Sequence, residues 1–252
     1  MPNVIRIEFG PLCLSDPVRP QWPLWDSFEE DGERALNALV MDCASNAACS
    51  KAFPLLAPDL QKLRDQRDSF FVFGLQLLQY SSATSRFIPL LVSETAAGRR
   101  EPLERAITQT RDRFVSQLSI GLHLSVMCSE EWQPGIEVPA GRRSVLRAEY
   151  DTACSNWPLA DVPPDFRMPT RIDRPALIVA GEWDPVTSPR WAQMADQFSR
   201  TQLVLVPKGG HVFDGAMIAC IGRMTAEFLA RGNTNAACAQ RNNRPAYAFP
   251  LS

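Results

Sequence analysis

Two polar residues, Asp184 and His211, have the types and spacing of an acid–base pair. Asp184 follows the apolar run 176–180, and His211 follows a second apolar run at 203–206. Short continuous apolar runs are typical of buried parallel strands, and the carboxyl ends of such strands gather catalytic groups at one sheet edge. A carboxylate hydrogen-bonded to one imidazole nitrogen fixes the ring tautomer and stabilises the imidazolium. We therefore expect Asp184 to orient His211 as a general base.

Each residue also has a simpler interpretation when it is taken alone. Asp184 precedes Pro185, and Asp-Pro often begins a turn or caps a helix. A histidine in a loop is often only a surface residue. The pair is the stronger signal, because Gly209 and Gly210 permit the sharp turn that would present the His211 ring.

The segments around this pair predict alternating strands and helices. Strands are expected at 176–180 and 202–206, and helices at 188–199 and 214–231. A further short strand is expected at 3–9, followed by a proline-rich loop up to Trp25. The tail, 232–252, is expected to be a loosely packed extension.

The region from 26 to about 130 has helical periodicity and lacks strand–helix alternation. Ser27 and Glu30 have the spacing of a capping box at the start of its first helix. Residues 70–73 could form either a helix or a buried strand. Residues 132–175 are rich in proline, with one short helix around 143–153. The further expected helices are 59–66, 70–80, 86–97, 101–111 and 112–128.

Composition excludes several classes of function. The 252 residues include 26 basic and 28 acidic side chains, a net charge of −2, so no basic footprint for nucleic acid is present. No apolar run approaches 18 residues, so we expect no membrane span. The N-terminus does not have the pattern of a signal peptide. Two histidines and the lack of C-x-x-C argue against a zinc site, and we expect no metal and no cofactor.

Six of the seven cysteines fall into pairs along the chain, and Cys13 is left over. The pairs are Cys43 with Cys49, Cys128 with Cys154 and Cys220 with Cys238. Two interpretations remain open: disulfides of an exported protein, or buried free thiols of a cytosolic protein. Export would require a signal that this sequence does not show.

Residues 175–213 resemble the C-terminal part of α/β-hydrolase fold serine peptidases of the prolyl and tripeptidyl aminopeptidase type. The resemblance extends over nearly the whole chain. It includes a C-x-E-[DE] motif that begins at Cys128 and ends at Glu131. Its other segments are Asp42-Cys43 to Cys49 with Phe53-Pro54, Cys154 to Trp157-Pro158, and Cys220-Ile221-Gly222-Arg223 with Cys238.

This resemblance implies a partial α/β-hydrolase fold, consisting of the C-terminal strands and helices of a mainly parallel sheet with a large helical cap. Residues 1–25 would be a remnant of the core, 26–165 the cap, and 166–252 the C-terminal part of the core. Asp184 would be the triad acid and His211 the base, while Glu130 and Glu131 would approach the substrate's α-amino group. The family and the cysteine pairs indicate a secreted or periplasmic protein.

The nucleophile of this chemistry belongs on a G-x-S-x-G turn, and the sequence contains none. We therefore expect an N-terminally truncated serine hydrolase that is inactive alone. Its substrate would be a peptide or a small acyl compound. Its open sheet edge would pair with an N-terminal half-chain or with a second copy. The alternatives are a non-catalytic binding protein derived from the fold, and a truncated esterase.

Overall fold

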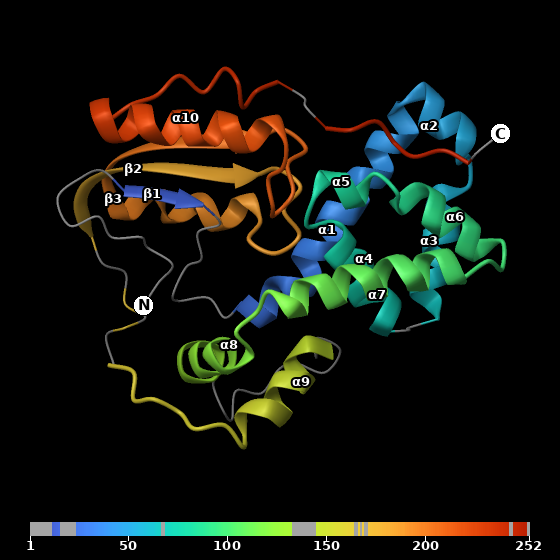
Figure 1. Cartoon of the computed structure of the whole chain (residues 1–252), viewed down its shortest axis with the longest axis horizontal. Helices are drawn as coiled ribbons and strands as arrows, with labels where there is room; N and C mark the ends of the chain where they lie inside the picture. The colour runs from blue at the N-terminus through green and yellow to red at the C-terminus, as the bar shows by residue number, and fades with distance from the viewer. Residues whose placement is uncertain are drawn as a thin grey trace.

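The computed structural model describes residues 12–15, 24–66, 69–132, 145–163, 166, 168, 171–241 and 244–250. The strand expected at 3–9 lies outside these residues. A small sheet with its flanking helices occupies one end of the long axis, and a group of helices occupies the other (Figure 1). The strands point toward the helical end, so their carboxyl ends lie at the junction between the two parts.

The sheet has three parallel strands in the order β1-β2-β3. They are β1 (Leu12–Ser15), β2 (Ile172–Gly181) and β3 (Phe198–Val206). Leu12 aligns with Ala176, and Ala176 aligns with Thr201. The sequence predicted a loop where β1 lies. That prediction is wrong because this four-residue segment contains no proline and can complete a ladder with β2.

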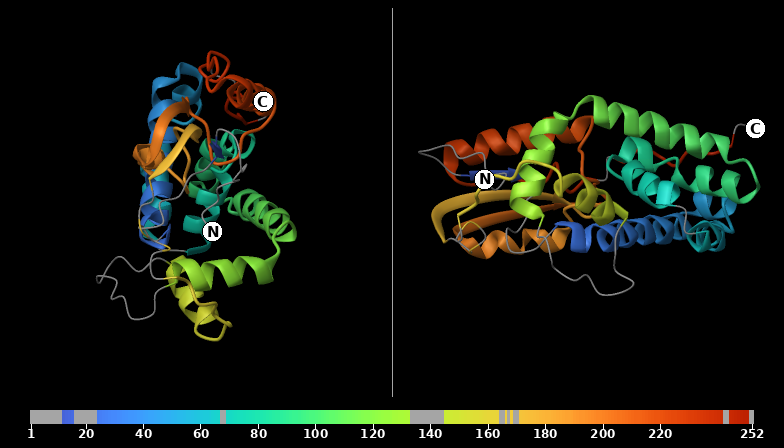
Figure 2. Two further views of the ribbon diagram at one scale, coloured as in Figure 1. Left: turned by 90° about the vertical axis from the view of Figure 1, so that its left-hand side faces the viewer. Right: turned by 90° about the horizontal axis from the view of Figure 1, so that it is seen from below.

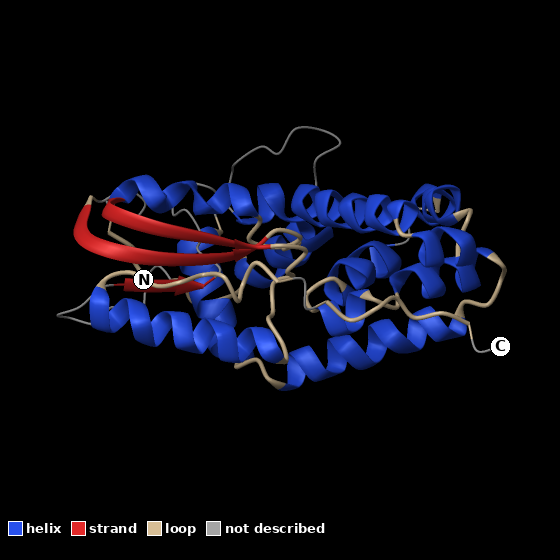
Figure 3. Cartoon of the chain, turned by 90° about the horizontal axis from the view of Figure 1, so that it is seen from above, coloured by secondary structure: helices blue, strands red, loops and turns tan. Residues whose placement is uncertain are grey.

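Helices cover both faces of the sheet (Figure 3). On one face, α10 (Ala216–Arg231) buries Met224 and Phe228 against Val204 and Val206. On the other, η2 (Pro189–Gln197) packs Ala192 against Ile178. The sequence predicted an α-helix here, whereas η2 is a 3₁₀-helix. A tighter helix rises further per residue, which suits a short crossover between Ser188 and the start of β3.

The seven helices that follow β1 in the chain, α1 to α7, pack together at the other end of the long axis (Figure 1), and we call them the helical unit. They are α1 (Leu24–Ser45), α2 (Ala47–Ala52), α3 (Leu56–Asp65), α4 (Ser69–Leu78), α5 (Ser82–Ser85), α6 (Ile88–Ala96) and α7 (Glu101–Ser116). They share one core, which includes Leu39, Leu60, Phe71, Ile88, Leu103 and Ile107. The helical reading of residues 26–130 is therefore confirmed in outline. No helix in the described part of the chain is both long and apolar enough to cross a membrane.

Two details of the helical prediction need correction. Helix α1 begins at Leu24, so Ser27 lies inside the helix and does not cap it. Helix α7 continues through the break expected after residue 111, because Leu103 and Ile107 anchor its first half in the core and nothing in its sequence stops it before Ser116. Residues 70–73, for which a strand was the alternative, are helical in α4.

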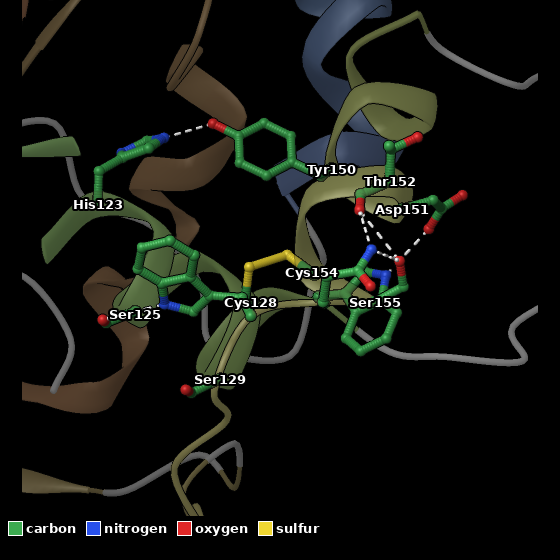
Figure 4. Close-up of a disulfide and its surroundings, with 12 residues drawn as sticks. His123, Ser125, Cys128, Ser129, Tyr150, Asp151, Thr152, Cys154 and Ser155 are labelled. Carbon is green, nitrogen blue, oxygen red and sulfur yellow. Dashed lines mark hydrogen bonds between the residues drawn. A yellow bond between two sulfur atoms is a disulfide. The ribbon is translucent and has the colours of Figure 1, made fainter. Parts of the chain in front are cut away.

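A second group of helices follows α7. It consists of α8 (Ile120–Val126), the π-helix η1 (Met127–Glu131) and α9 (Val145–Cys154). The Cys128–Cys154 disulfide joins η1 to α9, and His123 is hydrogen-bonded to Tyr150 close by (Figure 4). Disulfides also join Cys43 to Cys49 and Cys220 to Cys238. All three cysteine pairs that are neighbours along the chain are therefore disulfides in the structure.

The Cys128–Cys154 disulfide should carry much of the stability of α8, η1 and α9, because α8 buries none of its residues. The double variant Cys128→Ser/Cys154→Ser is expected to lower the local unfolding free energy by about 3 kcal/mol, since the disulfide spans 26 residues. Amide hydrogen exchange across residues 120–157 measures this loss. The control Cys43→Ser/Cys49→Ser should leave that segment unchanged, and equal effects from the two variants would contradict the assignment.

The tail after α10 is packed, which corrects the expectation of a loose extension. It runs back from the end of α10 to the helical unit (Figures 1 and 2). Tyr247 and Ala248 are buried, and the rings of Phe249 and Phe53 stack. The Tyr247 hydroxyl donates to Asp42 on α1. These apolar contacts and this hydrogen bond were not visible in the proline-containing, polar sequence of the tail.

Candidate active site

Asp184 follows β2 by three residues and is fully buried. Its Oδ1 accepts hydrogen bonds from the backbone N–H groups of Val186 (2.7 Å) and Thr187 (2.9 Å). Its Oδ2 accepts from the Thr187 hydroxyl at 2.8 Å. The turn interpretation and the acid interpretation are therefore compatible. Oδ1 accepts the backbone hydrogen bonds that close the turn, and Oδ2 accepts only a side-chain hydroxyl from this turn, which leaves room for a second donor.

His211 follows β3 and meets this second oxygen. Its Nδ1 lies 3.1 Å from Asp184 Oδ2 and 3.3 Å from the Thr187 hydroxyl. The His211 side chain is 23% exposed, whereas the Asp184 side chain is inaccessible. With a proton on Nδ1, the ring donates to the carboxylate and leaves Nε2 as the basic nitrogen. The structure thus brings together the two residues that the sequence placed at neighbouring strand ends.

The environment of Asp184 favours its ionised form. Burial by itself raises the pKa of this carboxyl. The hydrogen bond and charge of His211, together with the bonds from Val186 and Thr187, outweigh burial and hold the pKa of Asp184 below its ordinary value. An ionised acid is what a histidine needs in order to be oriented and stabilised as a cation.

Glycine permits the close approach that places His211. A Cβ on Gly181, the last residue of β2, would lie 2.3 Å from the carbonyl oxygen of Gly210. A Cβ on Gly210 would lie 2.6 Å from the carbonyl oxygen of Tyr80. The loop before His211 is therefore wedged between the end of β2 and the chain just after α4, with backbone atoms on both sides. Only a residue without a side chain fits at either position.

The loop after β2 is anchored to α1. Arg34 donates to the carbonyl oxygens of Glu182 (2.9 Å) and Asp184 (2.6 Å). The buried Gln76 of α4 donates to the carbonyl oxygen of Pro185 at 2.8 Å. These contacts join the sheet and the helical unit at the position of the acid.

Tyr80 of the helical unit lies against the histidine. Its ring is 5.2 Å from the His211 ring, in an edge-on arrangement. Burial first, and then the charges of Asp184 and Tyr150, raise the pKa of the Tyr80 phenol.

Glu130 and Glu131 lie on η1, beside the buried Cys128, and both are partly exposed. They belong to the group of helices fastened by Cys128–Cys154 (Figure 4). His123 lies in the same group, where burial lowers the pKa of its imidazole and Tyr150 is its hydrogen-bond partner. The His123 ring also lies beside the Tyr150 ring, with 5.8 Å between their centres.

Sequence reasoning missed several residues of the site. Thr187 had a local signal, because an Asp-Pro pair with a threonine three residues after the aspartate is typical of a turn closed by side chains. Tyr80, Arg34 and Gln76 had none, because they are more than 100 residues from Asp184 in the chain. No group of three or more potential metal ligands occurs within the residues that the structure describes.

Parallel strands flanked by helices, with an acid and a histidine after successive strands, are the arrangement of α/β hydrolases. Residues 143–242 match the family model described as TAP-like protein, which supports a TAP-like α/β-hydrolase region in this part of the chain. The match covers α9, β2, η2, β3 and α10. No curated protein and no solved structure matches the chain significantly.

Proposed function

We propose that Asp184 and His211 are the acid and the general base of a serine hydrolase, and that the enzyme is an aminopeptidase that releases residues or short peptides from peptide N-termini. One observation carries this proposal. The Asp184 carboxylate and His211 Nδ1 lie 3.1 Å apart, after successive parallel strands of a TAP-like region.

In the proposed reaction, His211 Nε2 takes the proton of a serine hydroxyl as the oxygen attacks the scissile carbonyl. Asp184 stabilises the imidazolium that results, and Thr187 holds the carboxylate in position. The same imidazolium then returns its proton to the leaving amine. Water repeats the cycle on the acyl-enzyme and releases the product.

We propose that the serine and the oxyanion-hole donors lie outside these 252 residues, because no G-x-S-x-G occurs among them. In the described part of the chain, β1 pairs only with β2, so its other edge is available for a strand. A strand that paired there in parallel would end at the same sheet edge as β2 and β3. Its terminal turn would then face the Asp184–His211 pair.

The helical unit together with α8, η1 and α9 would form the cap over this edge. In our proposal Glu130 and Glu131 bind the substrate's α-ammonium group, since a carboxylate is its natural hydrogen-bond acceptor. Both residues lie on η1, which the Cys128–Cys154 disulfide fastens to α9. An esterase would have no use for an ammonium site.

A serine-directed fluorophosphonate tests the proposal. The chain alone should not be labelled, whereas a complex with the polypeptide that carries the nucleophile should be labelled on the serine of G-x-S-x-G. His211→Ala should suppress that labelling. Labelling that His211→Ala leaves unchanged would reject the role of His211, and labelling of a serine within this chain would reject an external nucleophile.

Substrate preference in the labelled complex separates peptidase from esterase. Glu130→Gln/Glu131→Gln should raise KM for aminoacyl anilides and leave KM for short acyl esters unchanged. An equal effect on KM for both substrates would reject the ammonium-binding role of Glu130 and Glu131 and would favour an esterase. If no complex is labelled at all, the lack of a nucleophile motif favours a non-catalytic binding protein.

The open edge of β1 predicts the state of the chain alone. We expect it to elute from size-exclusion chromatography as an oligomer, or to be poorly soluble, because an unpaired edge recruits other strands. Addition of the nucleophile-bearing polypeptide should convert it to a defined heteromer. A monomer that unfolds cooperatively would contradict this expectation.

A further inference from the structure

The side chain of Asp214, three residues after His211, does not cap α10, the helix that it precedes. The N-cap of α10 is Gly215, and no side chain caps that helix. The Asp214 carboxylate instead reaches the start of α5. It accepts hydrogen bonds from the hydroxyl groups of Ser81 and Ser82 and from the backbone N–H of Ala83 at 3.3 Å.

The same short segment of the helical unit also holds the two residues that flank His211 directly, Gly210 and Val212. The N–H of Val212 donates to the carbonyl oxygen of Tyr80 at 2.7 Å. Ser81 and Val212 form an isolated parallel bridge, and Gly210 packs directly on the Tyr80 backbone. The backbone on both sides of His211 therefore lies against residues 80–81, while the His211 side chain turns to Asp184.

We propose that Asp214 is a positioning residue, which holds His211 Nδ1 against Asp184 by fastening the loop 207–214 to Ser81 and Ser82. The proposal rests on the proposed role of His211 as the base, and it extends the site to a segment of the helical unit. Asp214 itself contacts neither the reacting atoms nor the imidazole.

Asp184 and His211 are held in place in different ways, and His211 therefore needs an additional anchor. Asp184 is buried and fixed by two backbone N–H groups, Thr187 and Arg34. His211 follows two glycines, which give its loop more conformational freedom to lose on ordering. A charge-assisted set of hydrogen bonds just beyond the histidine restricts that loop, and such bonds are about twice as strong as neutral ones.

The chain has only two histidines, so imidazole NMR reads His211 directly, and His123→Gln assigns the two resonances. The pKa of His211 is measured in the 252-residue chain with and without Asp184→Asn. The difference between the two is the coupling of the pair, expected to be about one pH unit or more. The same difference is then measured in the Asp214→Ala background, with the exposed Asp112→Ala as the matched control.

We expect Asp214→Ala to reduce the coupling by at least about half and Asp112→Ala to leave it unchanged. A residue that only capped α5 would shift the thermal midpoint and leave the coupling intact, and that result in a folded variant would overturn the proposal. If Asp214→Ala does not fold, Ser82→Ala makes the same test, because it removes only the two longer side-chain bonds. No turnover is needed, so a failure of the proposed function, seen in the labelling experiment, is distinguishable from a failure of this inference.

Discussion

Gly181→Ala is expected to lower the free energy of unfolding by about 3 kcal/mol or more. The new methyl group would lie 2.3 Å from the carbonyl oxygen of Gly210 and 2.6 Å from that of Gly209. Both obstacles are backbone atoms, and the loop that contains them is held on its far side by Tyr80. The clash can therefore be relieved only by moving the loop that carries His211. Urea denaturation measures the loss.

The matched control for this variant is Gly222→Ala in α10. A Cβ at Gly222 meets nothing within 4 Å. Alanine in a helix interior is favoured over glycine, so this variant should raise the free energy of unfolding by about 0.5–1 kcal/mol. Similar small effects from both substitutions would show that the end of β2 and the His211 loop are not in contact.

Asp184→Asn is expected to lower the free energy of unfolding by about 3 kcal/mol at neutral pH. The amide keeps the size of the carboxylate but loses its charge and one of its two acceptor oxygens. It is buried where Thr187 and His211 both approach the same oxygen. The exposed Asp173→Asn, on β2, should change stability by less than about 0.5 kcal/mol.

The cost of Asp184→Asn should diminish in acid. The pKa of Asp184 is lowered in the folded chain, so its ionised form stabilises the fold above the unfolded carboxyl pKa, which is about 3.9. That contribution is lost as the pH falls through the lowered folded value. The difference between wild type and variant should therefore shrink below about pH 4. If the stability difference between wild type and Asp184→Asn does not change with pH, the charge of the Asp184 carboxylate does not stabilise the fold.

In the proposed complex with the nucleophile-bearing polypeptide, the same variant should reduce kcat by about 10⁴-fold, because the amide selects the wrong tautomer of the histidine. Its stability and its rate can be separated by working at a temperature where the variant is folded. An unchanged kcat in Asp184→Asn would reject the proposed role of Asp184 as the acid that orients His211.

Local sequence patterns predicted much of the fold. Continuous apolar runs located β2 and β3, and spaced apolar residues located α1, α3, α4, α6 and α7, whereas the short helices α2 and α5 were not predicted. Boundaries were less certain, because capping and periodicity act over a few residues: Ser27 has the pattern of a cap but lies within α1. The strand β1 was missed because four residues between prolines carry no periodicity, and only pairing with β2 makes them a strand.

Local sequence was enough to predict the acid–histidine pair, since residue type and position after a strand are local properties. The tertiary structure alone decided what holds that pair. Tyr80, Arg34 and Gln76 reach the site from segments that are distant in the chain, and their side-chain types have no pattern that depends on the site. Asp214 is close to His211 in the sequence, but its partners Ser81 and Ser82 are distant. The close approach at Gly181 is likewise a relation between two segments. Packing between distant segments is set by the whole core, and a single local stretch does not encode it.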